Sequence, residues 1–248
     1  MEPVFRTLEI AAALAIRVTG SRLTFHGLDN IPARGGAVLA INHTGYVDFL
    51  PAALAATTRR RRMRFMIKAE MNDVRVVRFL IKHTGTIPVD RSAGHDAYAV
   101  AVQRLRDGEL VGVYPEATIS RSFELKEFKS GAARMALEAQ VPVIPLVVWG
   151  AHRIWTKDHP KALGRNKFPV TVAVSAPLAP VGTVDLLEGE LRTTMTALLH
   201  DAQQAYDHPP GAYWVPRRLG GSAPTVAEAR QMEEAELADR QRRRAGRQ

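Results

Sequence analysis

The stretch that decides the fold runs from Val38 to Leu50 and reads Val-Leu-Ala-Ile-Asn-His-Thr-Gly-Tyr-Val-Asp-Phe-Leu. Its apolar start is typical of a buried strand that ends at Asn42-His43. Asp48 follows His43 by five positions, so on one ideal helix their side chains would lie roughly 140° apart. They can meet if His43 lies in a turn and Asp48 enters on the first helical turn. Asp48 would then orient the imidazole and leave its other nitrogen free as a base.

Outward from this stretch, strands and helices alternate along the chain. Apolar runs bounded by glycine and proline predict strands at 23–27, 37–41, 85–91, 110–114, 141–147 and 170–174. Helices are expected at 4–18, 46–56, 71–82, 97–106, 133–139 and 185–206. This alternation predicts a single α/β domain with a central, mostly parallel or mixed β-sheet flanked by helices. Pro88 favours an edge position or the end of a strand.

Three regions are expected along the 248 residues. Residues 1–20 form an N-terminal amphipathic helix that either lies against a membrane or packs on the core. Residues 21–208 form the main domain. Pro209-Pro210-Gly211 indicates a linker, so 209–248 is predicted to be a linker followed by a charged, exposed or partly disordered helical tail.

The charge of the chain limits its partners. A net charge of +9 favours nucleic acid, an anionic membrane surface or phosphorylated ligands. Aromatic residues make up only 6%, with no basic-aromatic platform for stacking bases, so we expect no nucleic acid partner. The basic run Arg59–Arg64 either contacts anionic lipid or forms a solvated loop.

The absence of certain residues and segments is also informative. The chain has no cysteine, which excludes disulfides, thiolate metal sites and a cysteine nucleophile. No stretch reaches the roughly 18 apolar residues of a spanning helix, and the Met-Glu-Pro start does not resemble a signal peptide. The lack of a spanning segment does not exclude contact with a membrane.

Further motifs follow His43 in order along the chain. Gly85–Arg91 ends a short strand with an arginine, and Tyr114–Ser120 places Pro115-Glu116 at the end of another. A Phe-Lys-x-Gly pattern begins at Phe128, and residues 141–147 form a proline-bearing apolar strand. With Asn42-His43-x4-Asp48, these motifs resemble those of the glycerolipid acyltransferases, in particular the 1-acylglycerol-3-phosphate (lysophosphatidic acid) acyltransferases.

The resemblance implies a reaction and a set of roles. An acyl group would pass from acyl-CoA or an acyl carrier protein thioester, used as co-substrate, to the hydroxyl of lysophosphatidic acid. His43 would act as the catalytic base and Asp48 would orient it. Neither a metal nor a further cofactor is implied. Residues expected to bind the acceptor, its phosphate or its glycerol, are Arg91, Glu116, Thr118, Arg121 and Lys129.

Two departures from the family pattern affect these roles. Ala117 stands where the family has glycine, so a positive φ there would cost about 1 kcal/mol or more. Ile119 stands where the family often has a phosphate-binding arginine, and Arg121, Lys126 or Lys129 would have to supply that charge.

Three alternatives remain open. The same chemistry on glycerol 3-phosphate or another lysophospholipid or lyso-glycolipid fits the Ile119 departure. A hydrolase would use Ser120 or Ser130 as nucleophile, although no Gly-x-Ser-x-Gly elbow is present. A basic membrane-binding module without catalysis would bind lipid and turn over no thioester.

Overall fold

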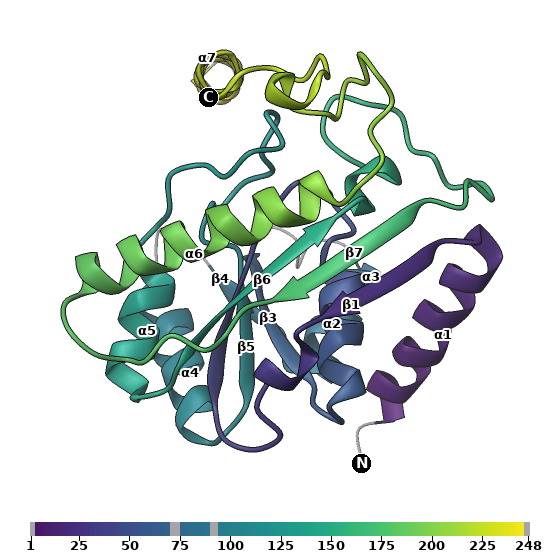
Figure 1. Ribbon diagram of the computed structural model, residues 1–248. Helices are drawn as coiled ribbons and strands as arrows, with labels where there is room; N and C mark the ends of the chain where they lie inside the picture. The colour runs from purple at the N-terminus through teal and green to yellow at the C-terminus, as the bar shows by residue number, and fades with distance from the viewer. Residues whose placement is uncertain (1–2, 70–74, 90–93, 246–248) are drawn as a thin grey trace.

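A seven-stranded sheet runs through the described residues, 3–69, 75–89 and 94–245, of the computed structural model (Figure 1). The strands are β1 (Arg22–His26), β2 (Ala37–Ile41), β3 (Met63–Lys68), β4 (Ile87–Val89), β5 (Leu110–Val113), β6 (Val143–Trp149) and β7 (Pro169–Val174). Their order is β1-β7-β6-β2-β5-β3-β4. Only the β6–β7 pair of this sheet is antiparallel, so the prediction of a mostly parallel or mixed sheet is confirmed.

Helices cover both faces of the sheet (Figure 1). They are α1 (Pro3–Thr19), α2 (Phe49–Thr58), α3 (Arg75–Thr84), α4 (Gly94–Arg106), α5 (Gly131–Ala139), α6 (Val184–Gln204) and α7 (Val226–Ala245). Successive side chains of the buried strand β2 point to opposite faces of the sheet. Val38 and Ala40 pack in the cluster that includes α4, α5 and α6, whereas Leu39 and Ile41 pack in the cluster that includes α2. A single α/β domain with helices at both ends is therefore confirmed.

The strand boundaries agree closely with the prediction at the centre of the sheet and less well elsewhere. β2 has the predicted bounds, and β4, which carries Pro88, is an edge strand as expected. By contrast, α2 begins at Phe49, three residues later than predicted, so Asp48 is the residue before the helix. The delay leaves a longer turn after β2, and this turn holds His43.

The segment after α6 requires a correction. The prolines and glycine at 209–211 suggest a linker, but Trp214, Val215 and Ala223 are buried in the main core cluster. Trp214 is 5% exposed and its ring lies 6.2 Å from that of Trp149 in β6. Residues 212–223 therefore pack against the domain, and only α7 is a largely exposed charged helix, as the tail was expected to be.

Part of the basic run Arg59–Arg64 is used inside the domain. The buried Arg64 pairs with Glu109 at 3.1 Å. Arg61 donates to three loop carbonyls, those of Pro32, Gly35 and Gly108. These guanidinium groups hold loops together, a role that neither a lipid contact nor a solvated loop describes.

The helix α1 presents apolar side chains on two sides. Ala13 and Ile16 help to line an apolar cleft of about 380 Å³ against β1 and α2. Ile10, Leu14 and Val18, spaced four residues apart, are exposed on the helix. Among the described residues, no helix has the length and apolar character needed to cross a bilayer.

Candidate active site

His43 follows β2 directly because the side chain of Asn42 ends the strand. The buried Asn42 amide donates from Nδ2 to the carbonyl of Val148 at 3.1 Å and accepts at Oδ1 from the N–H of Val148 at 2.7 Å. This side chain takes the place of the next backbone ladder pair between β2 and β6. The main chain is thereby freed to turn away from the sheet at His43.

Asp48 lies beside the His43 imidazole at 3.4 Å between Nδ1 and Oδ2. The same oxygen accepts the backbone N–H groups of Thr44 at 2.8 Å and Gly45 at 2.7 Å. Burial raises the pKa of the Asp48 carboxyl, and hydrogen bonding to His43, Gly45 and Thr44 opposes that rise. Three donors at one oxygen favour a fixed carboxylate that orients the ring, although Nδ1–Oδ2 is long for a hydrogen bond, as in many unliganded sites.

Gly45 leaves the room that this turn needs. A Cβ at position 45 would lie 2.8 Å from the Cα of His152 and 3.2 Å from Oδ1 of Asp48. A side chain there would force the backbone at His152 to move. The turn of Asn42 to Asp48 therefore brings imidazole and carboxylate together from positions that could not meet on one helix.

The ring of His43 is supported on one face and open at its edge. It stacks on Tyr114, which follows β5, with ring centroids 4.1 Å apart and an angle of 24° between the planes. The side chain is 20% exposed. Because Nδ1 faces Asp48, we assign the proton to Nδ1 and the free lone pair to Nε2, the nitrogen available to a substrate.

Glu116 occupies a position that the sequence did not indicate. Its Oε1 accepts the backbone N–H of His43 at 2.8 Å, and its Oε2 accepts that of Lys126 at 3.1 Å. Burial raises the pKa of Glu116 to about 8, against the effect of these two N–H groups and the Lys126 ammonium. Both oxygens are thus engaged by the main chain. These contacts give Glu116 a positioning role toward His43, and its orientation of the acceptor stays a prediction.

The loop after β5 also holds the carbonyl of His43. The N–H of Ser120 donates to it at 2.8 Å. Between Glu116 and Ser120, Ala117 adopts φ 60°. This is the left-handed conformation that a glycine at this place in the motif would favour. The Ser120 hydroxyl is buried and donates to the carbonyl of Glu124 at 2.7 Å, which does not suit a hydrolase nucleophile.

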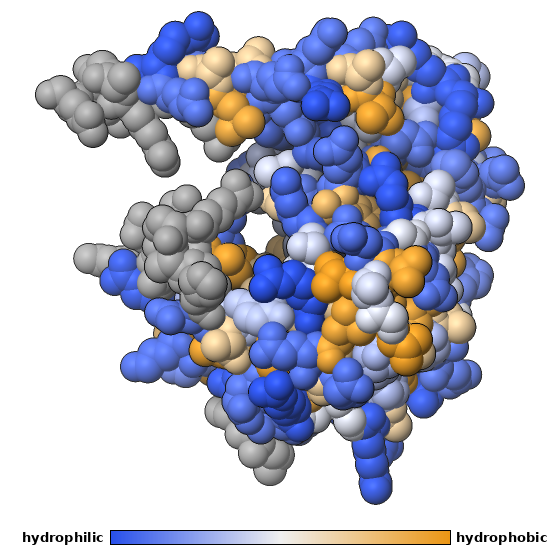
Figure 2. Space-filling model, turned by 90° about the vertical axis from the view of Figure 1, so that its left-hand side faces the viewer, coloured by the Kyte–Doolittle hydropathy of each residue, from blue (hydrophilic) through white to orange (hydrophobic). Residues whose placement is uncertain are grey.

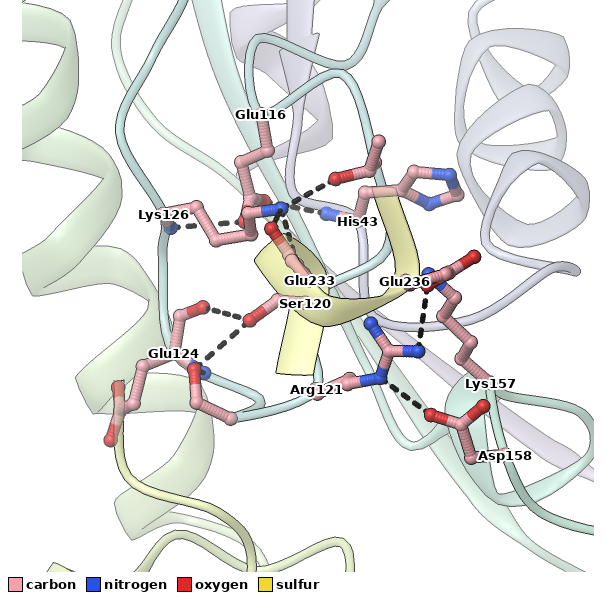
Figure 3. Close-up of polar contacts among 12 residues, drawn as sticks. His43, Glu116, Ser120, Arg121, Glu124, Lys126, Lys157, Asp158, Glu233 and Glu236 are labelled. Atoms are coloured by element: carbon pink, nitrogen blue, oxygen red, sulfur yellow. Dashed lines mark hydrogen bonds and ion pairs between the residues drawn. The ribbon is translucent and has the colours of Figure 1, made fainter. Parts of the chain in front are cut away.

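Of the remaining expected binding residues, Arg121 is shown in Figure 3, where it points toward Asp158 and Glu236. Thr118 accepts a short hydrogen bond from the ammonium of Lys126. Arg121 is 8% exposed and pairs with Asp158 and with a glutamate of α7. Lys129 is exposed, and its backbone N–H donates to Pro115. Arg91 lies outside the described residues.

Several residues at the site carried little signal in the sequence. Asn42 and Tyr114 belong to the predicted motifs, so their positions were visible but their contacts were not. Lys157, Glu233 and Glu236 come from loops and from α7, far from any motif, yet Figure 3 shows them gathered beside the loop that holds His43. Among the described residues, no group of three or more histidine, aspartate or glutamate side chains has an arrangement that would hold a metal ion.

Comparison with known proteins gives consistent results. The model of the Acyltransferase family matches residues 22–149, which include both motif-bearing loops. A 1-acyl-sn-glycerol-3-phosphate acyltransferase of Bacillus subtilis is 29% identical over 123 residues, covering 49% of this chain and 60% of the relative. The enzyme of the same name from Borreliella burgdorferi is 24% identical, covering 62% of each chain. The matches thus span less than two thirds of these relatives.

A solved structure shows the same fold. The crystal structure of the 1-acyl-sn-glycerophosphate (LPA) acyltransferase PlsC from Thermotoga maritima superposes with a TM-score of 0.70. It covers 83% of this chain and 82% of its own, at 20% sequence identity.

Proposed function

This chain belongs to the acyltransferase family, and we propose that it moves a fatty acyl group from an acyl thioester to the free hydroxyl of lysophosphatidic acid. The product is phosphatidic acid, an intermediate of phospholipid biosynthesis. The observation that supports this proposal best is the His43–Asp48 pair at the end of β2, with Nδ1 against the carboxylate.

The reaction follows from what one oriented imidazole can do. An alcohol is a poor nucleophile at neutral pH, so Nε2 of His43 removes the hydroxyl proton while that oxygen attacks the thioester carbonyl. The tetrahedral intermediate then expels the thiolate, which takes the proton from the imidazolium and leaves as a free thiol. Asp48 stabilises the imidazolium between these steps. No covalent enzyme intermediate is needed, in agreement with a chain that lacks cysteine.

The acceptor is held through its charge and its glycerol. Arg91, Arg121 and Lys129 supply cations for the phosphate, and the Thr118 hydroxyl contacts the glycerol. Support comes from the position of Thr118 and Lys126, which lie on the loop that Glu116 ties to the backbone of His43. The donor is acyl-CoA or the thioester of an acyl carrier protein.

The enzyme works at a membrane in this proposal. Ile10, Leu14 and Val18 form an exposed apolar stripe on α1, and the net charge of +9 favours anionic lipid. We place the chain as a peripheral protein at the cytoplasmic face, where acyl thioesters are available.

Ile119 favours a different acceptor as the second candidate. Ile119, which is buried, stands where the family often has an arginine, so glycerol 3-phosphate or another lysophospholipid or lyso-glycolipid is the alternative.

The test is a free-thiol release assay with purified protein and anionic vesicles. Donors are palmitoyl-CoA and palmitoyl acyl carrier protein, and acceptors are lysophosphatidic acid, glycerol 3-phosphate and lysophosphatidylcholine, with products identified by mass. The proposal predicts phosphatidic acid at the highest kcat/KM. A higher kcat/KM for another acceptor would replace lysophosphatidic acid as substrate, and thiol release without any acylated product would reject acyl transfer.

A further inference from the structure

The helix α7 lies outside the two helix layers and crosses over the loop that holds His43 (Figures 1 and 3). Figure 2 shows the C-terminal region as a mostly hydrophilic arm that projects past the body. Little apolar surface attaches the arm, since Ala229 is the buried apolar residue among those described in the helix. Its attachment therefore depends largely on charged side chains.

Two carboxylates of α7 meet three cations next to the active site. Glu233 forms an ion pair with the ammonium of Lys126 at 2.6 Å. Glu236 pairs with Arg121 at 2.8 Å and with Lys157 at 2.5 Å. Glu233 and Glu236 are three positions apart, so they lie on one face of the helix. All three cations are less than one fifth exposed.

This cation cluster, defined as Arg121, Lys126 and Lys157, adjoins the proposed base. The backbone N–H of Lys126 is held by Glu116, whose other oxygen holds the backbone of His43. The Lys126 ammonium also donates to Thr118. An anion bound by the cluster would therefore sit beside the hydroxyl that His43 activates.

The cluster has the charge and the unused donor of an anion site. The two α7 carboxylates together carry the charge of one phosphate monoester, which is about −1.5 to −2 at neutral pH. Nη1 of Arg121 is buried and has no hydrogen-bond acceptor among the described residues, while Nε and Nη2 bind Asp158 and Glu236. Asp158 lies on a loop of the domain and not on α7, so Glu233 and Glu236 are the negative charges that would leave with the helix.

We propose that Lys126 and Lys157 join Arg121 in the subsite for the acceptor phosphate, and that α7 blocks it with Glu233 and Glu236 until the phosphate displaces them. The inference rests on the proposed function, because it takes the acceptor to be a phosphorylated glycerolipid. It also accounts for Ile119, since the missing cation of the motif is replaced by charges at 121, 126 and 157. A phosphate can compete with the two carboxylates because its charge matches theirs, and α7 has little buried apolar surface to keep it in place.

Hydrogen–deuterium exchange of the full chain tests displacement directly. A released helix loses the tertiary contacts from which most helical stability comes, so its amides exchange faster. We expect glycerol 3-phosphate at millimolar concentration to raise the exchange rate of α7 amides at least about threefold, and glycerol at the same concentration to leave it unchanged. Equal exchange in the two solutions would overturn the inference.

Kinetics with matched variants provide the second test. The double variant Glu233→Gln/Glu236→Gln removes the block, so the KM for lysophosphatidic acid should fall roughly 5- to 10-fold with kcat preserved. Added salt should lower this KM less in the double variant than in the unaltered chain. The control is Glu234→Gln, since Glu234 pairs with Arg230 of the same helix. A KM equal to that of the control, or a raised KM, would overturn the inference. If no acceptor supports thiol release, the proposed function fails, and the exchange measurement still decides whether phosphate displaces α7.

Discussion

His43 is held by four neighbours that come from two distant stretches of the chain. Glu116 accepts its N–H, Ser120 donates to its carbonyl, Asp48 faces Nδ1 and Tyr114 supports the ring. Three of these residues belong to the loop after β5. The second stretch therefore also holds the proposed base in place before a substrate arrives.

This arrangement predicts how Glu116→Gln will behave. Glutamine cannot accept both the His43 and the Lys126 N–H, so the imidazole shifts. We expect kcat to fall by about 10²-fold, with the KM for the acceptor little changed. Steady-state kinetics on a variant with unaltered circular dichroism would measure this split. A raised KM at normal kcat would instead show that Glu116 contacts the acceptor.

Ala117 stores backbone strain in the same loop, because φ 60° is unfavourable for a residue with a Cβ. Ala117→Gly should raise the free energy of unfolding by about 0.5–1 kcal/mol, the relief of strain exceeding the added entropy of the unfolded chain. Urea denaturation measures it. Ala99→Gly on the exposed face of α4 is the control and should lower stability by about 1 kcal/mol. Equal losses in both variants would mean that position 117 is unstrained.

The buried His152, next to the site, makes the stability of the folded protein depend on pH. Burial lowers its pKa to about 3, while its ordinary value is 6.5. The unfolded chain therefore binds a proton that the folded protein excludes, and stability present above pH 6.5 is lost as pH falls toward 3.

The matched comparison is His152→Phe, in which that titration is absent. From about pH 7 to about pH 5, the unaltered chain should lose about 2 kcal/mol more free energy of unfolding than the variant. Parallel urea titrations at the two pH values decide this. Identical losses would show that the imidazole is protonated in the folded state.

At the scale of elements, sequence patterns predicted strands better than turns and caps. The bounds of β2 were predictable because an apolar run ends abruptly at Asn42. The start of α2 was not, since residues 44–47 form a turn around the Asp48 carboxylate. Likewise, Pro209-Pro210-Gly211 resembles a linker locally, and only a long-range contact with Trp149 shows that the segment is packed.

That packing has a measurable consequence at Trp214. The ring is buried against Trp149 and His152, and the guanidinium of Arg153 lies 4.7 Å from its centroid. Trp214→Ala should lower the free energy of unfolding by about 3–5 kcal/mol, measured by urea denaturation. Exposed Tyr213→Ala serves as the control, with a much smaller loss. A change near zero at Trp214 would restore the linker interpretation.

At the scale of the whole molecule, the order of motifs along the chain was enough to predict the α/β class and the strand ends that build the site. The parallel strands β2 and β5 place the two motif-bearing loops side by side. The position of α7 was not predictable, because Glu233 meets Lys126 across 107 positions and no local pattern encodes that contact. Tertiary ion pairs of this kind depend on the assembled surface.

The central claim is that one imidazole activates the acceptor hydroxyl. The most direct measurement is thiol release from palmitoyl-CoA with lysophosphatidic acid by His43→Ala, beside His26→Ala as an exposed histidine control. We predict that kcat/KM falls by about 10²–10⁴-fold in the first variant and is unchanged in the second, with both folded by circular dichroism. Near-normal turnover by His43→Ala would contradict the account.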